Sequence, residues 1–220
     1  MTSDWFPMAL TDILSFLVSV LLLLVYHAFL KNKVRKDPSY TIQALNRTAR
    51  AMWVENFMRS GKPDVIPIQT LRNSTMAATF LASTAVLLIM GVLTLGAQAQ
   101  GSTGNMLNSY GTTHNEVWMI KLMLLLVNLF VAFFSFSMAI RIFNHIGFLI
   151  NVPVDLEKTS MTPQHVATYL NSAGKYYSIG MRTYYYCVPL VFWLFGPLYM
   201  LLATLILIPL LYKHDRAPKN

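Results

Sequence analysis

Two residues of opposite charge stand inside otherwise apolar runs of this sequence. Asp12 lies in a run that starts near Phe6, and Lys121 lies in a run from Val117 to Ile140. A charge at the centre of a membrane costs roughly 2.5–3.5 kcal/mol on insertion scales, so each needs a partner or water. Both stand about one turn inside their helices, so we expect them to pair or to face one outer vestibule. The alternative is that each side chain reaches separately to the surface.

A second group of reactive side chains is expected at the inner membrane boundary. His27 and His145 stand at similar depths on two predicted helices, where two imidazoles could hold a b-type haem or a divalent metal. The alternative is that they form hydrogen bonds to the backbone or to a carboxylate. Three arginines share this boundary and could contact lipid headgroups: Arg72, Arg141 and Arg182.

Catalytic motifs are missing from the sequence. We find no phosphate-binding glycine loop, no GxSxG elbow and no HExxH pair. The single cysteine, Cys187, excludes an internal disulfide and a CxxC pair. We therefore expect a protein that is not an enzyme and has no cofactor, with haem b on His27 and His145 as the alternative.

Polar side chains on two predicted spans could form a path for water or ions. The residues are Thr75, Thr79 and Ser83 in one span, and Asn128 and Ser135 in the next. They could line a pore together. The alternative is that they only pack, since small and polar residues also let membrane helices approach closely.

The elements that position these residues are membrane spans. Hydrophobic residues make up 55% of the 220 and charged residues 12%, with a mean hydropathy of +0.48; a soluble domain carries about twice that charge fraction. Four runs reach the roughly 20 residues that a span requires, at about 6–30, 75–97, 117–140 and 185–211. We expect an all-α integral membrane protein of one domain, 1–220. The first run should be an anchor rather than a cleaved signal, because no Lys or Arg precedes it.

Positive charges predict the orientation, because Lys and Arg accumulate in cytoplasmic connections. The stretch 98–116 has none, whereas 31–72 has nine: Lys31, Lys33, Arg35, Lys36, Arg47, Arg50, Arg59, Lys62 and Arg72. We therefore place both termini outside the cytoplasm, in the inner (plasma) membrane. The tail, with Lys213, Arg216 and Lys219, is a mild exception. The formal charge of +8 then indicates anionic headgroups rather than nucleic acid as the partner.

Two cytoplasmic amphipathic helices are predicted in the long connections. The first should start at Asp37-Pro38, and its apolar face is Ile42, Leu45, Ala49, Met52 and Trp53. The second should open at Thr162-Pro163, with a stripe of Val166, Tyr169, Leu170, Ala173 and Tyr177. Each could lie in the interface plane or dock under the bundle.

The chain also reads as two similar halves, 6–97 and 117–211. Residues 28–32 (AFLKN) match residues 147–151 (GFLIN) after the corresponding helices. These halves would form a parallel repeat about an axis along the membrane normal, as in some transporters. The alternative is chance, because the matches are short and their spacers unequal.

Three blocks of sequence resemble a known family. They are residues 69–85 (QTLRNSTMAATFLASTA), residues 141–153 with Asn144-His145, and residues 180–185 (GMRTYY) continuing to 193–197 (WLFGP). Together they resemble the membrane-protein family called domain of unknown function 599, which is found in bacteria and plants. The resemblance implies a small multi-span membrane protein. It brings no activity, substrate, cofactor or site residue.

These features favour a non-enzymatic module that works as a homo-oligomer or as a subunit of a membrane complex. It could be a channel or transporter, with a water-lined path past Asp12, Lys121 and Asn128, or a scaffold with a dry core. The alternative is a redox module that holds haem on His27 and His145. No nucleic acid is expected as a partner.

Overall fold

The structure is a computed structural model that describes residues 5–37, 39–60, 65–100, 115–152 and 162–217. Over these ranges it contains six helices and no strand: α1 (Trp5–Lys36), α2 (Ile42–Ser60), α3 (Ile66–Gln100), α5 (Asn115–Leu149), α6 (Pro163–Phe195) and α7 (Pro197–Asp215). Four described helices are long and apolar enough to cross a membrane, over Leu10–Lys36, Ile66–Gln98, Val117–Leu149 and Pro197–Asp215. The predicted all-α membrane class and the count of four candidate spans are therefore confirmed.

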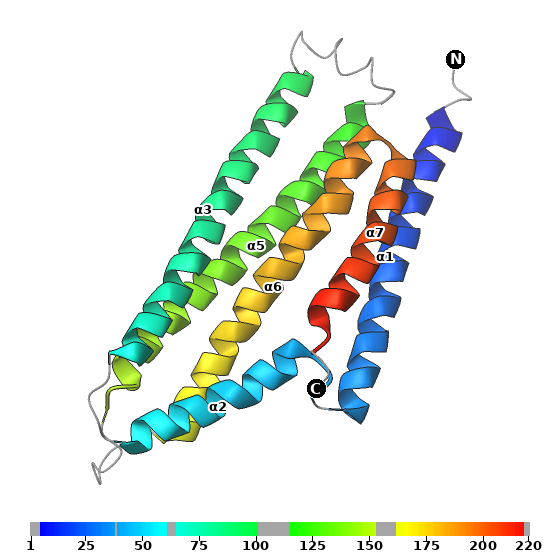
Figure 1. Ribbon diagram of the computed structural model, residues 1–220. Helices are drawn as coiled ribbons and strands as arrows, with labels where there is room; N and C mark the ends of the chain where they lie inside the picture. The colour runs from blue at the N-terminus through cyan, green and yellow to red at the C-terminus, as the bar shows by residue number, and fades with distance from the viewer. Residues whose placement is uncertain (1–4, 38, 61–64, 101–114, 153–161, 218–220) are drawn as a thin grey trace.

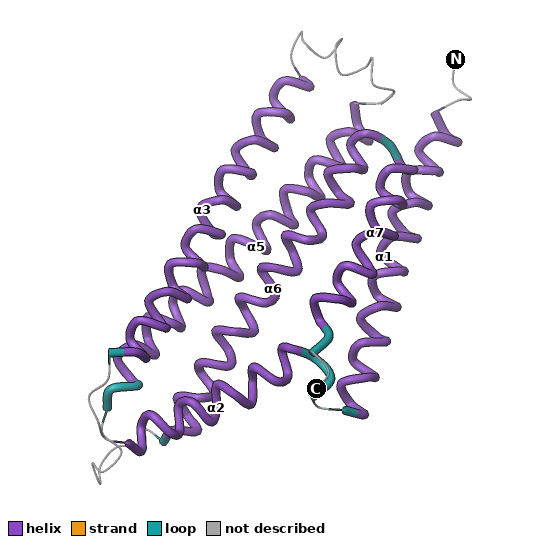
Figure 2. Tube along the Cα trace, viewed as in Figure 1, coloured by secondary structure: helices purple, strands orange, loops and turns teal. Residues whose placement is uncertain are grey.

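Five helices run lengthwise in the bundle, and α2 lies across one end (Figure 1). We call the end that carries α2, Lys36 and Asp215 the α2 end, and the opposite end the far end. Helix α5 packs between α3 and α6, while α7 packs between α6 and α1. Figure 2 shows short loop segments where α1 approaches α2 and where α6 gives way to α7.

Helix α6 differs from the prediction of a short amphipathic helix followed by a separate span. It is one helix over Pro163–Phe195. It begins as predicted, because the Thr162 side chain accepts the His165 N–H and Pro163 occupies the first turn. The helix has no break at Gly180, which lies against the ring of Phe136, where a Cβ would come within 2.7 Å of ring carbons. The helix thus continues past α5 along the bundle.

The chain reverses at Gly196, so the fourth candidate span is α7 and not residues 185–211. Gly196 has φ +145°, a backbone conformation that residues with a Cβ rarely adopt. Pro197 then supplies the first position of α7. Pro189 and Pro209 lie within α6 and α7 without ending them.

The return of α7 places the described ends of the chain at opposite ends of the bundle (Figure 1). Thr41 and Arg216 form an isolated β-bridge, and the Ala217 N–H donates to the Tyr40 carbonyl at 3.0 Å. The C-terminal part is therefore tied to the segment before α2, far from Trp5. This differs from the expectation that both termini share one side, because that expectation counted 185–211 as a single span.

Helix α2 starts later than predicted. Its cap is Thr41, whose hydroxyl accepts the Ala44 N–H at 3.3 Å. The Asp37 carboxylate instead accepts the Ser39 hydroxyl at 2.6 Å and the Ser39 N–H at 2.9 Å. These bonds hold the pKa of the Asp37 carboxyl below its usual value. Asp37 therefore closes a turn before the helix.

The buried face of α2 also differs from the predicted one. Val54 and Met58 are buried in a cluster with α5 and α6, whereas Leu45 and Met52 are 47% and 66% exposed. Helix α2 packs along α6. The apolar periodicity of the segment correctly predicted a helix. The face that is buried is the one that contacts α6, and it differs from the predicted face.

Small residues set the packing of α3 on α5. Ala78 and Ala82, which stand four residues apart on α3, are buried, and Ala82 clusters with Ala132 and Phe136 of α5. The two halves of the chain have different plans, because α2 crosses the end of the bundle whereas α6 runs along it (Figure 1). The internal repeat stays a prediction from sequence.

Candidate functional site

The structure brings Asp12 and Lys121 together at the far end of the bundle. The Lys121 Nζ lies 2.9 Å from Asp12 Oδ1, and the side chains are 2% and 14% exposed. Trp193 is the third member, which the sequence did not indicate. Its indole N–H donates to Asp12 Oδ1 at 2.8 Å, and its carbonyl accepts from Lys121 Nζ at 3.2 Å. Helices α1, α5 and α6 therefore meet at one charged cluster.

The end of α6 explains why Trp193 joins this pair. The last carbonyls of a helix lack partners within the helix, and Trp193 stands two residues before Phe195, where α6 ends. The ammonium of Lys121 also lies 5.3 Å from the centroid of the Trp193 ring, and Phe16 stacks on that ring at 5.1 Å. Because each charged group has a partner, the cluster suits a structural clamp between helices.

A second charged cluster lies where α6 passes the end of α7. The Arg182 guanidinium donates to both carboxylate oxygens of Asp215, at 3.0 and 3.1 Å. The Tyr26 hydroxyl donates to Asp215 Oδ2 at 2.8 Å. This cluster ties α1, α6 and α7 together at the α2 end.

His27 belongs to this second cluster. Its Nδ1 lies 2.8 Å from the Leu23 carbonyl, which can only accept, so Nδ1 carries the proton. Its Nε2 then accepts from the Tyr186 hydroxyl at 2.9 Å and from Arg182 at 3.3 Å. Both ring nitrogens are therefore engaged within the protein.

His145 lies in different surroundings. Its ring is 5.5 Å from that of Tyr169, whose other neighbour is His165 at 5.1 Å. At the α2 end, α1 and α5 lie on opposite sides of the view in Figure 1. The structure therefore does not bring His27 and His145 to one site, because α1 packs along α7. Within the described ranges, no three His, Cys, Asp or Glu residues gather as metal ligands.

The three boundary arginines are also separate. Arg182 is paired with Asp215, whereas Arg72 and Arg141 are exposed on α3 and α5. They form no common anion site in the described structure.

The polar residues predicted to form one path face different neighbours. Asn128 Nδ2 donates to the Thr183 carbonyl and lies 3.0 Å from the Cys187 sulfur, both on α6. Ser135 donates to its own helix, to the Val131 carbonyl at 2.7 Å.

On α3, the Thr75 and Thr79 hydroxyls donate to backbone carbonyls four residues earlier, both at 2.9 Å. Thr79 and Ser83 are exposed on that helix. The α3 row and Asn128 are thus not arranged around one path.

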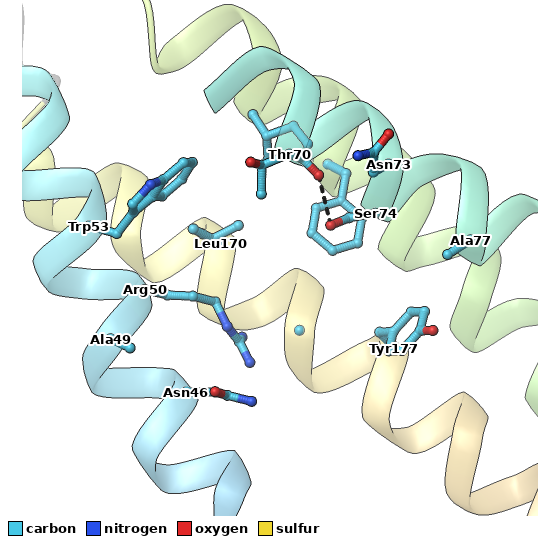
Figure 3. Close-up of a pocket in the computed structure, with 13 residues that line it drawn as sticks. Asn46, Ala49, Arg50, Trp53, Thr70, Asn73, Ser74, Ala77, Leu170 and Tyr177 are labelled. Atoms are coloured by element: carbon cyan, nitrogen blue, oxygen red, sulfur yellow. Dashed lines mark hydrogen bonds between the residues drawn. The ribbon is translucent and has the colours of Figure 1, made fainter. Parts of the chain in front are cut away.

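A pocket that the sequence analysis missed lies between α2, α3 and α6 at the α2 end. Its volume is about 770 Å³. Figure 3 shows Arg50 and Asn46 projecting from α2 into the space that Thr70 and Ser74 face from α3. The full lining is Asn46, Ala49, Arg50, Trp53, Thr70, Leu71, Asn73, Ser74, Ala77, Phe143, Leu170, Gly174 and Tyr177. Residues from four helices, α2, α3, α5 and α6, form this pocket together, so no local sequence pattern signals it.

Arg50 is the charged residue among those that line the pocket. A Cβ on Gly174 would lie 1.8 Å from a guanidinium nitrogen of Arg50, so the guanidinium rests directly on the backbone of α6. Burial lowers the pKa of Arg50, and the group nevertheless stays protonated at neutral pH.

Four apolar candidate spans and two ion-paired clusters between helices define a multi-span helical membrane protein. The chain matches the family described as "Protein of unknown function, DUF599" over residues 14–220, and it belongs to that family. This confirms the resemblance predicted from sequence. No curated protein and no solved structure matches the chain.

Proposed function

We propose that this membrane protein is a non-enzymatic scaffold whose polar interior joins helices instead of lining a conduction path. The observation that carries the proposal is Asn128, which bonds to α6 at Thr183 and Cys187. Among described buried side-chain polar atoms, only the Ser19 hydroxyl and the Trp118 indole nitrogen have no hydrogen-bond partner. Most described buried polar side chains are therefore bonded within the protein, which supports the proposal that they join helices.

The proposed orientation has the α2 end in the cytoplasm. Nine Lys and Arg residues fall in 31–72, and the return of α7 brings Lys213 and Arg216 to the same end. The basic tail is then no exception to the positive-inside rule. The N-terminal side of α1 lies outside in this arrangement.

A scaffold of this kind acts as a homo-oligomer or as a subunit of a larger membrane complex. Helix α3 offers a face for such contact, because a Cβ on Gly91 would meet no atom within 4 Å. Native mass spectrometry would read this association as a discrete mass above that of one chain.

A channel or transporter is the second candidate, and one observation favours it. The pocket between α2, α3 and α6 borders the segment of α3 that leads to Thr75 and Thr79. A transported species could enter the bundle there if α3 moved away from α6.

The single cysteine, Cys187, separates the two candidates because it lies beside Asn128. In proteoliposomes, a charged thiol reagent should leave Cys187 unmodified in the scaffold, while detergent-denatured protein reacts fully. The matched control is Gln98→Cys in a Cys187→Ser background, since Gln98 is exposed at the far end of α3 and should react. Rapid modification of Cys187, together with ion flux that Asn128→Leu abolishes, would establish the channel instead.

A further inference from the structure

We infer that the pocket between α2, α3 and α6 binds an anionic phospholipid, with the lipid phosphate on the Arg50 guanidinium. The inference is independent of the choice between scaffold and channel. It rests on the charge of Arg50, on the mixed polar and apolar lining of the pocket, and on the position of the pocket in the fold.

Arg50 is half-buried without a counter-charge. Among the described residues no carboxylate pairs with it, and its hydrogen bond to Asn171 Oδ1 is long at 3.5 Å. Arg182 is also partly buried, but the Asp215 carboxylate supplies its counter-charge. A partly desolvated guanidinium needs an anion, and its fork of donors matches the oxygens of a phosphate.

Gly174 leaves the space on α6 that this guanidinium occupies. Any side chain there would overlap the guanidinium, because a Cβ would lie 1.8 Å from one nitrogen and 2.5 Å from the central carbon. The absence of a Cβ lets Arg50 lie against α6 while its remaining donors face the pocket (Figure 3).

The walls of the pocket suit an amphiphile rather than a small ion. Asn46, Asn73 and Ser74 supply polar groups, and the Ser74 hydroxyl donates to the Thr70 carbonyl at 3.0 Å, so its oxygen can still accept. Trp53 and Phe143 supply apolar surface in the same pocket. The volume of about 770 Å³ falls in the range of small-molecule sites, roughly 300–1,000 Å³.

The position of the pocket also favours a lipid. On α3 its lining runs from Thr70 to Ala77, which is where the polar start of the helix passes into its apolar run. This end of the bundle carries the Lys and Arg excess that attracts anionic headgroups. A free phosphate would use the same guanidinium but would leave the apolar lining residues Trp53 and Phe143 uncovered.

Native mass spectrometry of the full chain, titrated with phosphatidylglycerol or phosphatidylcholine in mild detergent, tests the inference. We expect one phosphatidylglycerol to be retained in preference to phosphatidylcholine, and Arg50→Gln to weaken its binding about tenfold or more. The matched control is Arg47→Gln on the same helix. It removes the same charge from an exposed position outside the pocket and should change the affinity less than about threefold.

A second variant keeps the charge of Arg50 and changes the surface of α6 against which its guanidinium lies. Gly174→Ala should displace the guanidinium and weaken phosphatidylglycerol binding severalfold, with an unchanged elution volume showing that the protein is folded. Equal losses in the Arg47 and Arg50 variants, or no preference between the two lipids, would overturn the inference. Full displacement of the lipid by inorganic phosphate at millimolar concentration would also overturn the inference, because the apolar lining residues would then contribute nothing to binding.

Discussion

Buried charge concentrates at few residues in this protein, and those residues join helices. Asp12 and Lys121 are shielded from solvent and share Trp193, so removal of one charge leaves the other without its partner. The loss of one member of a buried pair typically costs about 3–5 kcal/mol. By contrast, Glu55 and Arg59 form an exposed pair on α2, with side chains 46% and 67% exposed. Such pairs contribute about 0–1 kcal/mol.

The variant Asp12→Asn tests this difference. It keeps an oxygen that can accept from Trp193 but leaves Lys121 buried and unpaired, so we expect a loss of about 3 kcal/mol of stability. The double variant Asp12→Asn with Lys121→Met should recover much of that loss. Thermal unfolding in detergent measures both, with Glu55→Gln as the control at about 0–1 kcal/mol. Equal effects of Asp12→Asn and Glu55→Gln would show that the pair stabilises nothing.

At the scale of elements, the path of the chain depends on the turn between α6 and α7. Gly196 adopts φ +145° there, and its N–H donates to the Trp193 carbonyl at 3.2 Å. The same carbonyl accepts from Lys121. The turn and the charged cluster at the far end therefore share an acceptor, which couples the reversal of the chain to the packing of α1 on α6.

Replacement of this glycine tests the turn. Gly196→Ala should cost about 1–3 kcal/mol because of its backbone conformation. Crowding is not the cause, since a Cβ would meet Tyr199 at an ordinary 3.5 Å. The control is Gly147→Ala within helix α5, where a Cβ meets nothing within 4 Å and the change should be neutral or stabilising. Urea or thermal unfolding in detergent measures the stability of both variants. Equal stabilities would show that a side chain at position 196 does not strain the turn.

For the whole molecule, the α6–α7 reversal decides at which end of the bundle α7 finishes. The structure ties the segment after α7 to the segment before α2. Any membrane that the bundle spans must therefore place Tyr40 and Arg216 on the same side. The proposed cytoplasmic α2 end follows from the charge distribution over both segments.

Cysteine labelling in intact cells tests this orientation. In a Cys187→Ser background, Lys213→Cys should react with an impermeant maleimide only after the membrane is permeabilised. Lys33→Cys should behave in the same way, because it lies at the same end, whereas Gln98→Cys should react without permeabilisation. A pattern in which Lys213→Cys follows Gln98→Cys would refute the arrangement of α7.

Features that depend on local composition could be predicted from the residues alone. Apolar run length gave the all-α membrane class and four candidate spans, and Thr162-Pro163 marked the start of α6 through capping that needs no distant partner. The sequence also singled out Asp12 and Lys121, because a charge in an apolar run is costly wherever the helix packs.

Which helices became neighbours depended on contacts across the folded bundle. That choice made Trp193 the third member of the Asp12 cluster, placed His27 beside Arg182 instead of His145, and created the Arg50 pocket between α2 and α6. It also turned residues 163–195 into one long helix that returns at Gly196. The physical reason is that hydropathy and helical period report the environment along one segment, whereas partners are set by contacts between segments far apart in sequence.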